Sequence, residues 1–127
     1  MDKTKILLEK FNMAKMRLSD VLSIPETDIV RDSAIQRFEI TVDLSWKLLK
    51  AYLEEYEGVS IYSSPKEIFR QAYKRGVIQY DTKWLDIIDM RNLTSHTYNE
   101  SLAIDIYEKL PETLNLFNHL TDNFKVE

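Results

Sequence analysis

Residues 35–56 read IQRFEITVDLSWKLLKAYLEEY, and their apolar side chains recur at steps of three and four positions. These steps are typical of one face of an α-helix, whereas a half-buried strand alternates at every second position. Gly58 follows the last periodic residue, and glycine is the residue type best suited to the left-handed conformation that closes a helix. The pattern therefore predicts one long helix that ends at Gly58. Its apolar stripe consists of Ile35, Phe38, Val42, Leu49, Tyr52 and Tyr56, and Trp46 and Leu53 widen it.

The segment before this helix has the same periodicity. It predicts a first helix that stops at Ile24-Pro25, because a residue before proline disfavours helical backbone. Residues 26–28, Glu-Thr-Asp, then offer a cap for the long helix. The first stripe comprises Leu7, Phe11, Ala14, Leu18 and Val21.

Two shorter helices are predicted downstream. Residues 63–67, Ser-Ser-Pro-Lys-Glu, place a serine cap before a proline and a glutamate in the first turn, which is a strong start signal. That helix is predicted to end at residues 74–76, Lys-Arg-Gly, where cations meet the negative end of the helix dipole. Asp81 is the predicted cap of the next helix. Its inward stripe consists of Trp84, Ile87, Ile88 and Arg91.

A fifth helix is predicted to begin at Thr97 or Asn99. Pro111 lies inside it and is expected to kink it, because an interior proline costs about 3 kcal/mol through a lost hydrogen bond and a clash with the preceding turn. The stripe of this helix is Ala103, Ile106, Leu110, Leu114, Phe117, Leu120 and Phe124.

The composition agrees with long helices joined by few turns. The chain has 127 residues, 44% of them hydrophobic, with two glycines and no cysteine. So few glycines disfavour an all-β chain, and the absence of cysteine excludes disulfide frameworks and thiolate chemistry. We predict a single domain over residues 1–127. Its expected fold is an all-α, antiparallel up-and-down four-helix bundle with an additional short helix packed on its side.

Charge and hydropathy narrow the expected partners. The formal net charge is −4 and the pI is about 5.3, which argues against binding through a general basic surface. Residues 66–91 alone carry a formal charge of +2, which suits either an approach path for phosphate or RNA or ordinary solvated helix faces. No stretch approaches 18 apolar residues, so we expect a cytoplasmic protein without a membrane span.

One position on the fourth helix does not fit core packing. Arg91 lies three, four and seven residues after Ile88, Ile87 and Trp84, where the stripe would place a leucine. A guanidinium aimed inward needs anionic or carbonyl partners, and Glu39 and Asp43 are the candidates on the long helix. Arg91 can therefore be a structural cross-link between helices or part of a functional site.

His96 and Tyr98 follow Arg91 where the fourth helix is predicted to end. A turn there can bring an imidazole, a guanidinium and a phenol to one rim, which combines a permanent cation with a group that titrates near neutrality. The sequence has no glycine-rich phosphate loop. With two histidines and no cysteine, it also has few of the side chains that bind transition metals. We therefore expect no metal site and no cofactor.

Three stretches resemble motifs of the nucleotidyltransferase substrate-binding proteins within the HEPN superfamily. Residues 91–98, RNLTSHTY, fit the R-x4-H-x-Y signature of that superfamily. Residues 38–50, FEITVDLSWKLLK, resemble the family's F-E-x-x-x-D/E-L-x-W-K-x-L-K stretch on its second helix. Residues 64–72, SPKEIFRQA, resemble its P-K/R-x-x-x-R/K-x-A helix. The resemblance covers nearly the full chain, with the motifs in order.

The resemblance implies a partner and a chemistry. The expected partner is a separately encoded minimal nucleotidyltransferase, and the expected assembly is a two-fold homodimer that brings both Arg/His rims into one cleft. In pairs that behave as toxin–antitoxin modules, the HEPN protein is a metal-independent RNase and the transferase is its antitoxin. By this resemblance, Arg91 and His96 are the candidate catalytic residues of this chain, and Tyr98 is the candidate acceptor of AMP. Asn92, Glu39 and Asp43 are the candidate supporting residues.

Three functions stay open at this point. The first is a binding module that associates with the transferase and holds nucleotide, or is modified, at the rim of Arg91, His96 and Tyr98. The second is an RNase toxin acting through Arg91 and His96 and neutralised by AMP transfer to Tyr98. The third is a purely structural helical dimerisation module, in which Arg91 and His96 only tie helices together.

Overall fold

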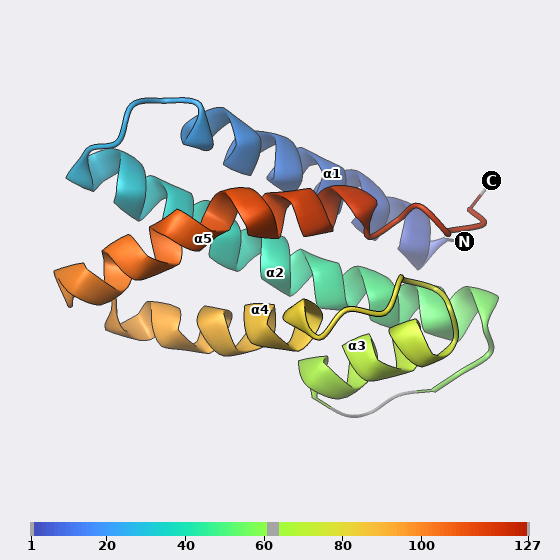
Figure 1. The fold of residues 1–127 in the computed structure, drawn as a ribbon. Helices are drawn as coiled ribbons and strands as arrows, with labels where there is room; N and C mark the ends of the chain where they lie inside the picture. The colour runs from blue at the N-terminus through green and yellow to red at the C-terminus, as the bar shows by residue number, and fades with distance from the viewer. Residues whose placement is uncertain (1, 61–63, 127) are drawn as a thin grey trace.

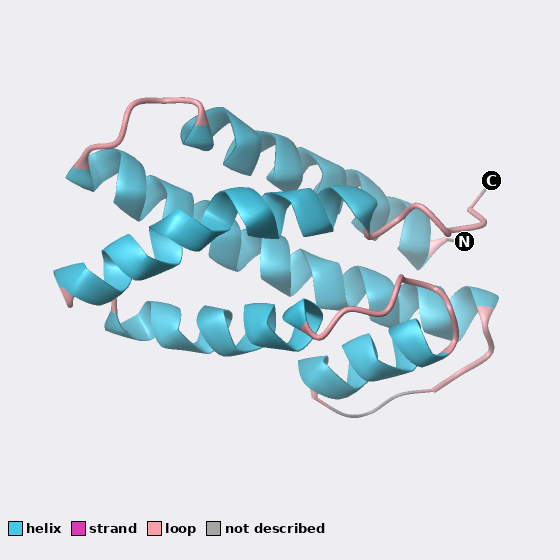
Figure 2. Cartoon of the chain, viewed as in Figure 1, coloured by secondary structure: helices cyan, strands magenta, loops and turns pink. Residues whose placement is uncertain are grey.

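The computed structural model describes residues 2–60 and 64–126, and all regular structure in these ranges is helical (Figure 1, Figure 2). The all-α class predicted from the sequence is confirmed. The elements are α1 (Lys3–Leu22), α2 (Asp28–Tyr56), α3 (Pro65–Lys74), α4 (Lys83–Leu93), the short 3₁₀ helix η1 (Thr94–His96) and α5 (Glu100–His119).

α1, α2, α4 and α5 run alternately in opposite directions along the bundle, and the short α3 lies beside α2 and α4 (Figure 1). α2 is the central element, because it contacts α1, α3, α4 and α5. The arrangement is the expected up-and-down bundle with one additional helix.

The helix starts follow the capping residues in the sequence. The hydroxyl of Thr27 accepts a hydrogen bond from the Val30 amide at the start of α2. Ser64 caps α3 in the same way. Of the two starts considered for α5, Asn99 provides the cap, since its side-chain oxygen accepts from the Leu102 amide at 3.2 Å. Ser63, the other serine of the predicted α3 start, lies outside the described residues.

Two predicted boundaries need correction. Thr82, not Asp81, occupies the N-cap position of α4, although the Asp81 carboxylate still accepts a hydrogen bond from the Lys83 amide at 2.9 Å. α5 ends at His119, so Phe124 lies in the tail beyond the helix. The tail packs on α2, where the Phe124 ring stacks on Tyr52 with a centroid separation of 4.2 Å. Phe124 therefore packs as a tail residue and does not extend the helical stripe.

Pro111 is accommodated inside α5, which stays helical from Glu100 to His119. The ribbon of α5 changes direction along its length (Figure 1). A proline has no N–H to offer the carbonyl of the preceding turn, so a local bend is its expected effect. The predicted kink and the observed bend agree.

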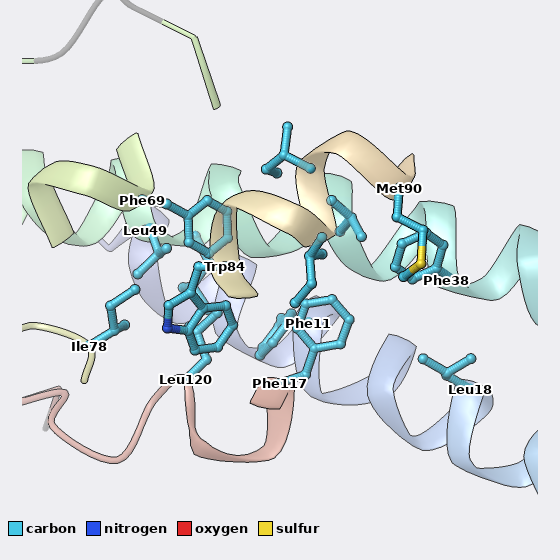
Figure 3. Close-up of a cluster of buried hydrophobic side chains, with 14 of the residues drawn as sticks. Phe11, Leu18, Phe38, Leu49, Phe69, Ile78, Trp84, Met90, Phe117 and Leu120 are labelled. Carbon is cyan, nitrogen blue, oxygen red and sulfur yellow. The ribbon is translucent and has the colours of Figure 1, made fainter. Parts of the chain in front are cut away.

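Aromatic side chains from different helices meet in the core. Phe11 of α1 and Phe117 of α5 meet edge to face, with their centroids 5.9 Å apart (Figure 3). Phe69 of α3 is fully buried and stacks on Trp84 of α4 at 5.5 Å (Figure 3). α3 thus supplies part of the core, which is more than the side packing expected of it.

The ends of α1 and α2 are joined by a carboxylate. Glu55 near the end of α2 accepts hydrogen bonds from the amides of Lys3 and Thr4, at 3.1 and 2.7 Å, and from the Thr4 hydroxyl. These amides have no partner within α1, because they belong to its first turn. The Thr4 bonds lower the pKa of Glu55 below its ordinary value. The start of α1 is therefore fixed against the end of α2.

Candidate functional site

Arg91 joins α4 to α2 through two carboxylates. Its Nε and Nη2 atoms donate to Oδ1 and Oδ2 of Asp43, at 3.2 and 3.1 Å, in a two-pronged contact. Its Nη1 atom donates to Glu39 Oε2 at 3.0 Å. Glu39 and Asp43 are four residues apart on α2, so one guanidinium spans one helical turn. The partners predicted for Arg91 are the partners observed.

Thr94 closes this network where α4 ends. Its hydroxyl oxygen accepts a hydrogen bond from Arg91 Nη1 at 3.0 Å. The same hydroxyl lies 2.7 Å from both Glu39 Oε2 and the Arg91 carbonyl, and its single hydrogen can serve only one of them at a time. Thr94 is buried, so its contacts also fix the start of η1 against α2.

The network is a partly exposed charge cluster. The side-chain exposures are 31% for Arg91, 29% for Glu39 and 41% for Asp43. Hydrogen bonding to Asp43 raises the pKa of Arg91 above its ordinary value, with coulombic support from both carboxylates. One cation and two carboxylates give the cluster a formal charge of −1. In this arrangement it attracts hydrogen-bond donors and cations more than phosphate.

His96 and Tyr98 follow Thr94 in the chain. His96 is the last residue of η1, and Tyr98 lies on the turn before α5. Both side chains are exposed, and the Tyr98 side chain is exposed to 85%. Their ring centroids are 6.1 Å apart in an edge-on arrangement. The structure places these two rings near each other, whereas the hydrogen bonds of the Arg91 guanidinium go to Glu39, Asp43 and Thr94. The Arg91 network is thus an inner charge cluster, and His96 and Tyr98 form an outer aromatic pair; a rim shared by all three side chains stays a prediction.

Asn92 is exposed and lines a hollow beside the charge cluster. The hollow has a volume of about 340 Å³ and is lined by Val42, Asp43, Trp46, Pro65, Ile88, Arg91 and Asn92. Sequence reasoning placed Trp46 in the widened core stripe, but its side chain is only half-buried. The one signal for a different role was its position three residues after Asp43, on the side of α2 that faces Arg91.

A second concavity runs between α4 and α5. This α4–α5 groove has a volume of about 480 Å³, and its apolar wall consists of Ile87, Met90, Leu93, Leu102, Ile106 and Leu116. The apolar side chain of Leu93 in this wall is 45% exposed. An ion pair between Lys83 and Glu112, one residue from each helix, crosses the groove.

Most cations in residues 66–91 are already paired with carboxylates. Lys66 contacts Asp89 at 2.6 Å, Arg70 contacts Glu67 at 3.4 Å, and Lys83 contacts Glu112. This pairing favours the interpretation of solvated helix faces over a basic approach path. In the part of the chain that the structure describes, no three His, Asp or Glu side chains form a group that could hold a metal ion. No described helix is long and apolar enough to cross a membrane.

Replacing Arg91 by methionine tests the cluster. Glu39 and Asp43 then face each other without a cation, so we expect the free energy of unfolding to fall by about 2 to 3 kcal/mol, less than for a fully buried pair. Adding Asp43→Asn to Arg91→Met is expected to recover part of this loss, and the double-mutant cycle measured by urea denaturation gives the coupling. The control is Arg70→Met, which breaks a surface pair and is expected to cost less than about 1 kcal/mol. An Arg91→Met chain as stable as the parent would contradict the structural role of the cluster.

Comparisons with known proteins agree with this architecture. The family model described as "Nucleotidyltransferase substrate binding protein like" matches residues 7–126. A Haemophilus influenzae protein named "Probable ribonuclease HepT" is 35% identical over 97 residues, which is 70% of this chain and 66%, just under two thirds, of that relative.

Two solved structures share the fold over nearly the whole chain. A crystal structure from Thermus thermophilus has a TM-score of 0.84 and 35% identity, and the match covers 91% of this chain and 99% of that one. A Haemophilus influenzae structure, described as revealing the fold of a substrate binding domain of a nucleotidyltransferase, has a TM-score of 0.74 and 25% identity, with 98% and 100% covered. With the helical bundle, the R-x4-H-x-Y segment and a family match over residues 7–126, the chain belongs to the family of nucleotidyltransferase substrate-binding proteins.

Proposed function

We propose that this chain is the protein partner of a separately encoded minimal nucleotidyltransferase, in a two-component module of the toxin–antitoxin type, and that the transferase attaches AMP to Tyr98. The observation that carries the proposal is the 85% exposure of the Tyr98 side chain on the turn before α5. An acceptor hydroxyl must enter the active site of another protein, which an exposed turn residue can do without unfolding of the bundle. The family description and the name of the related H. influenzae substrate-binding domain support such a partner.

The chain has little of its own with which to hold a nucleoside triphosphate. Its two glycines, Gly58 and Gly76, both have positive φ angles and close α2 and α3. Neither lies in a loop that cradles phosphates between a strand and a helix, as phosphate-binding loops do. The transfer chemistry is therefore assigned to the partner and the acceptor to this chain.

The proposed reaction is an in-line displacement. The Tyr98 oxygen attacks the α-phosphorus of ATP, a new oxygen–phosphorus bond forms, and the bond to pyrophosphate breaks. The phenolic proton passes to a base or to solvent in the transferase active site, and pyrophosphate leaves. The product carries a negatively charged AMP group close to His96, whose ring centroid is 6.1 Å from that of Tyr98.

Co-expression with a minimal nucleotidyltransferase encoded beside the gene of this chain tests this proposal. We expect the two chains to purify together, and the intact mass of this chain to rise by one or more adenylyl groups. Tyr98→Phe removes the acceptor oxygen and is expected to abolish the mass increase while the complex still forms. The matched control is Tyr80→Phe, which changes another exposed tyrosine far from the turn. Adenylylation that persists in Tyr98→Phe would refute the assignment of the acceptor.

We also propose that the chain forms a homodimer through the α4–α5 groove. The groove has an apolar wall, and Leu93 lies at the end of α4 that leads directly into η1 and His96. A second copy that covers this wall would bring both His96–Tyr98 pairs toward the same side of the assembly. Removal of apolar surface from water supplies the driving force.

The mass of the assembly in solution tests the dimer. We expect the chain to be dimeric and Leu93→Asp to be monomeric, because a charge at the apolar wall must be desolvated on association. Ile29→Asp is the control, since Ile29 is 82% exposed at the start of α2 and does not line the groove. A monomeric parent chain, or a Leu93→Asp chain that stays dimeric, would contradict this interface.

The name of the H. influenzae relative favours a second candidate, a metal-independent RNase toxin that uses Arg91 and His96. His96 would take the proton from a ribose 2′-hydroxyl, and the oxygen would attack the adjacent phosphorus. The 5′-oxygen would leave, taking up a proton from solvent, to give a 2′,3′-cyclic phosphate and a 5′-hydroxyl. Arg91 would stabilise the charge on the phosphorane only after it exchanges a carboxylate partner for the phosphate, because its described contacts engage both Glu39 and Asp43. Because Arg91 must first exchange a partner, we rank the RNase function below the AMP-acceptor function.

Cleavage of RNA in the presence of EDTA tests the second candidate. If the chain is an RNase, His96→Ala is expected to lower the rate by about 100-fold or more, since general acid–base catalysis contributes at least that much. His119→Ala is the matched control, because His119 is exposed on α5 and pairs with Asp122. Cleavage that survives His96→Ala, or that requires a divalent cation, would remove this mechanism.

A further inference from the structure

The hollow between Trp46 and Asn92 has no role in the proposed transfer to Tyr98. Asp43 and Arg91 of the charge cluster line it, and neither His96 nor Tyr98 does. Its volume of about 340 Å³ is near the lower limit of small-ligand pockets. The walls come from α2, α4 and the first residue of α3, which are held together by the buried core.

The walls of the hollow suit a flat ring. Trp46 contributes a half-buried indole and Pro65 an aliphatic ring, while Val42 and Ile88 are buried and lie beneath them. Stacking of a base on an aromatic side chain is worth about 1 to 3 kcal/mol. The ammonium group of Lys47 lies over the same indole, 5.7 Å from its centroid, in a contact worth only about 0.5 to 1 kcal/mol at an exposed site. An incoming base can therefore displace this flexible, exposed side chain.

The polar edge of the hollow accepts hydrogen bonds. Each carboxylate oxygen of Asp43 receives one N–H from Arg91, and each retains a further lone pair. Asn92 adds an exposed carboxamide, which both donates and accepts. The formal charge of −1 on the neighbouring cluster disfavours a phosphate at this edge. A neutral ring with an amino group meets all of these conditions.

We propose that this hollow is a subsite for a nucleobase that bears an exocyclic amino group. The base stacks on Trp46, its amino group donates to Asp43, and its ring edge pairs with the Asn92 carboxamide. The inference rests on the proposed function for its ligand class, since it gives the chain a contact with nucleotide or RNA apart from Tyr98. The same base can come from a free nucleotide or from a single strand of RNA.

The test uses the two tryptophans of the chain as reporters. The full-length chain is labelled with ¹⁵N, and the two indole N–H signals are followed during titration with adenosine. Trp84 is 2% exposed and donates to the Gln79 carbonyl at 3.1 Å, so its signal is the internal reference. Trp46→Phe identifies the other signal. We expect adenosine to shift the Trp46 signal in a saturable way and to leave the Trp84 signal unchanged.

Four further ligands test which chemical group is recognised and whether the base comes from a free nucleotide or from RNA. Uridine has no amino group and is expected to bind at least tenfold more weakly than adenosine. Inorganic phosphate is expected neither to shift the Trp46 signal nor to compete. AMP and a short single-stranded oligoadenylate separate the sources: similar affinities indicate a free nucleotide, and tenfold tighter binding of the oligomer indicates RNA. Either result supports a base subsite.

Variants separate stacking from the polar edge. Binding to the variants is measured by isothermal titration calorimetry, because Trp46→Leu removes the reporter indole. Trp46→Leu is expected to weaken adenosine binding about tenfold, which corresponds to about 1.4 kcal/mol of lost stacking. Asn92→Ala changes an exposed side chain and provides a second test if Trp46→Leu does not fold. Tyr80→Leu removes an exposed aromatic ring outside the hollow and is the control.

Several outcomes would overturn the inference. They are the absence of any saturable shift of the Trp46 signal, competition by phosphate alone, equal binding of uridine and adenosine, and unchanged binding in both Trp46→Leu and Asn92→Ala. The titration contains no transferase, so its failure leaves the modification of Tyr98 intact. Conversely, loss of the Tyr98 reaction does not affect the titration.

Discussion

The burial of α2 on more than one side is the constraint on which the rest of the structure depends. A 29-residue helix that contacts all four other α-helices must present apolar surface around much of its circumference. One row of that surface is the stripe visible in the sequence. A second row contains small residues, and the hydroxyls of Thr41 and Ser45 in it bond back to carbonyls of their own helix at 2.7 and 2.6 Å. Polar side chains can thus be buried there without losing hydrogen bonds. The second row consists of Ala34, Thr41, Ser45, Leu48 and Ala51.

α2 also carries the groups that position the candidate site. Glu39 and Asp43 lie on its half-exposed side and hold the guanidinium of Arg91, which fixes the end of α4. Thr94 joins the same network, so η1 starts from a fixed point and places His96 and Tyr98 outside the bundle. The inner cluster therefore helps to position the outer pair. A structural role for Arg91 is thus compatible with a chemical role for Tyr98.

The proposals give different roles to different parts of this arrangement. An acceptor tyrosine has to be accessible, and Tyr98 is exposed on a turn between two anchored helices. Substrate recognition needs shape and fixed polar groups, and the hollow beside Trp46 is built on the rigid side of the same network. The α4–α5 groove supplies a third surface that begins at the same end of α4. Under these proposals, binding, modification and association use neighbouring but different residues.

Sequence by itself determined the helices, most of their caps and the pairing of Arg91 with Glu39 and Asp43. These follow from spacing along one helix and from the cost of an unpaired buried charge, which are local or nearly local rules. Only the tertiary structure decided where Phe124 packs, that Trp46 faces a hollow, and that the His96 and Tyr98 rings meet edge-on. Those features depend on how the helices are placed in space, because half-burial of a side chain and the direction of a turn are set by neighbours distant in the chain.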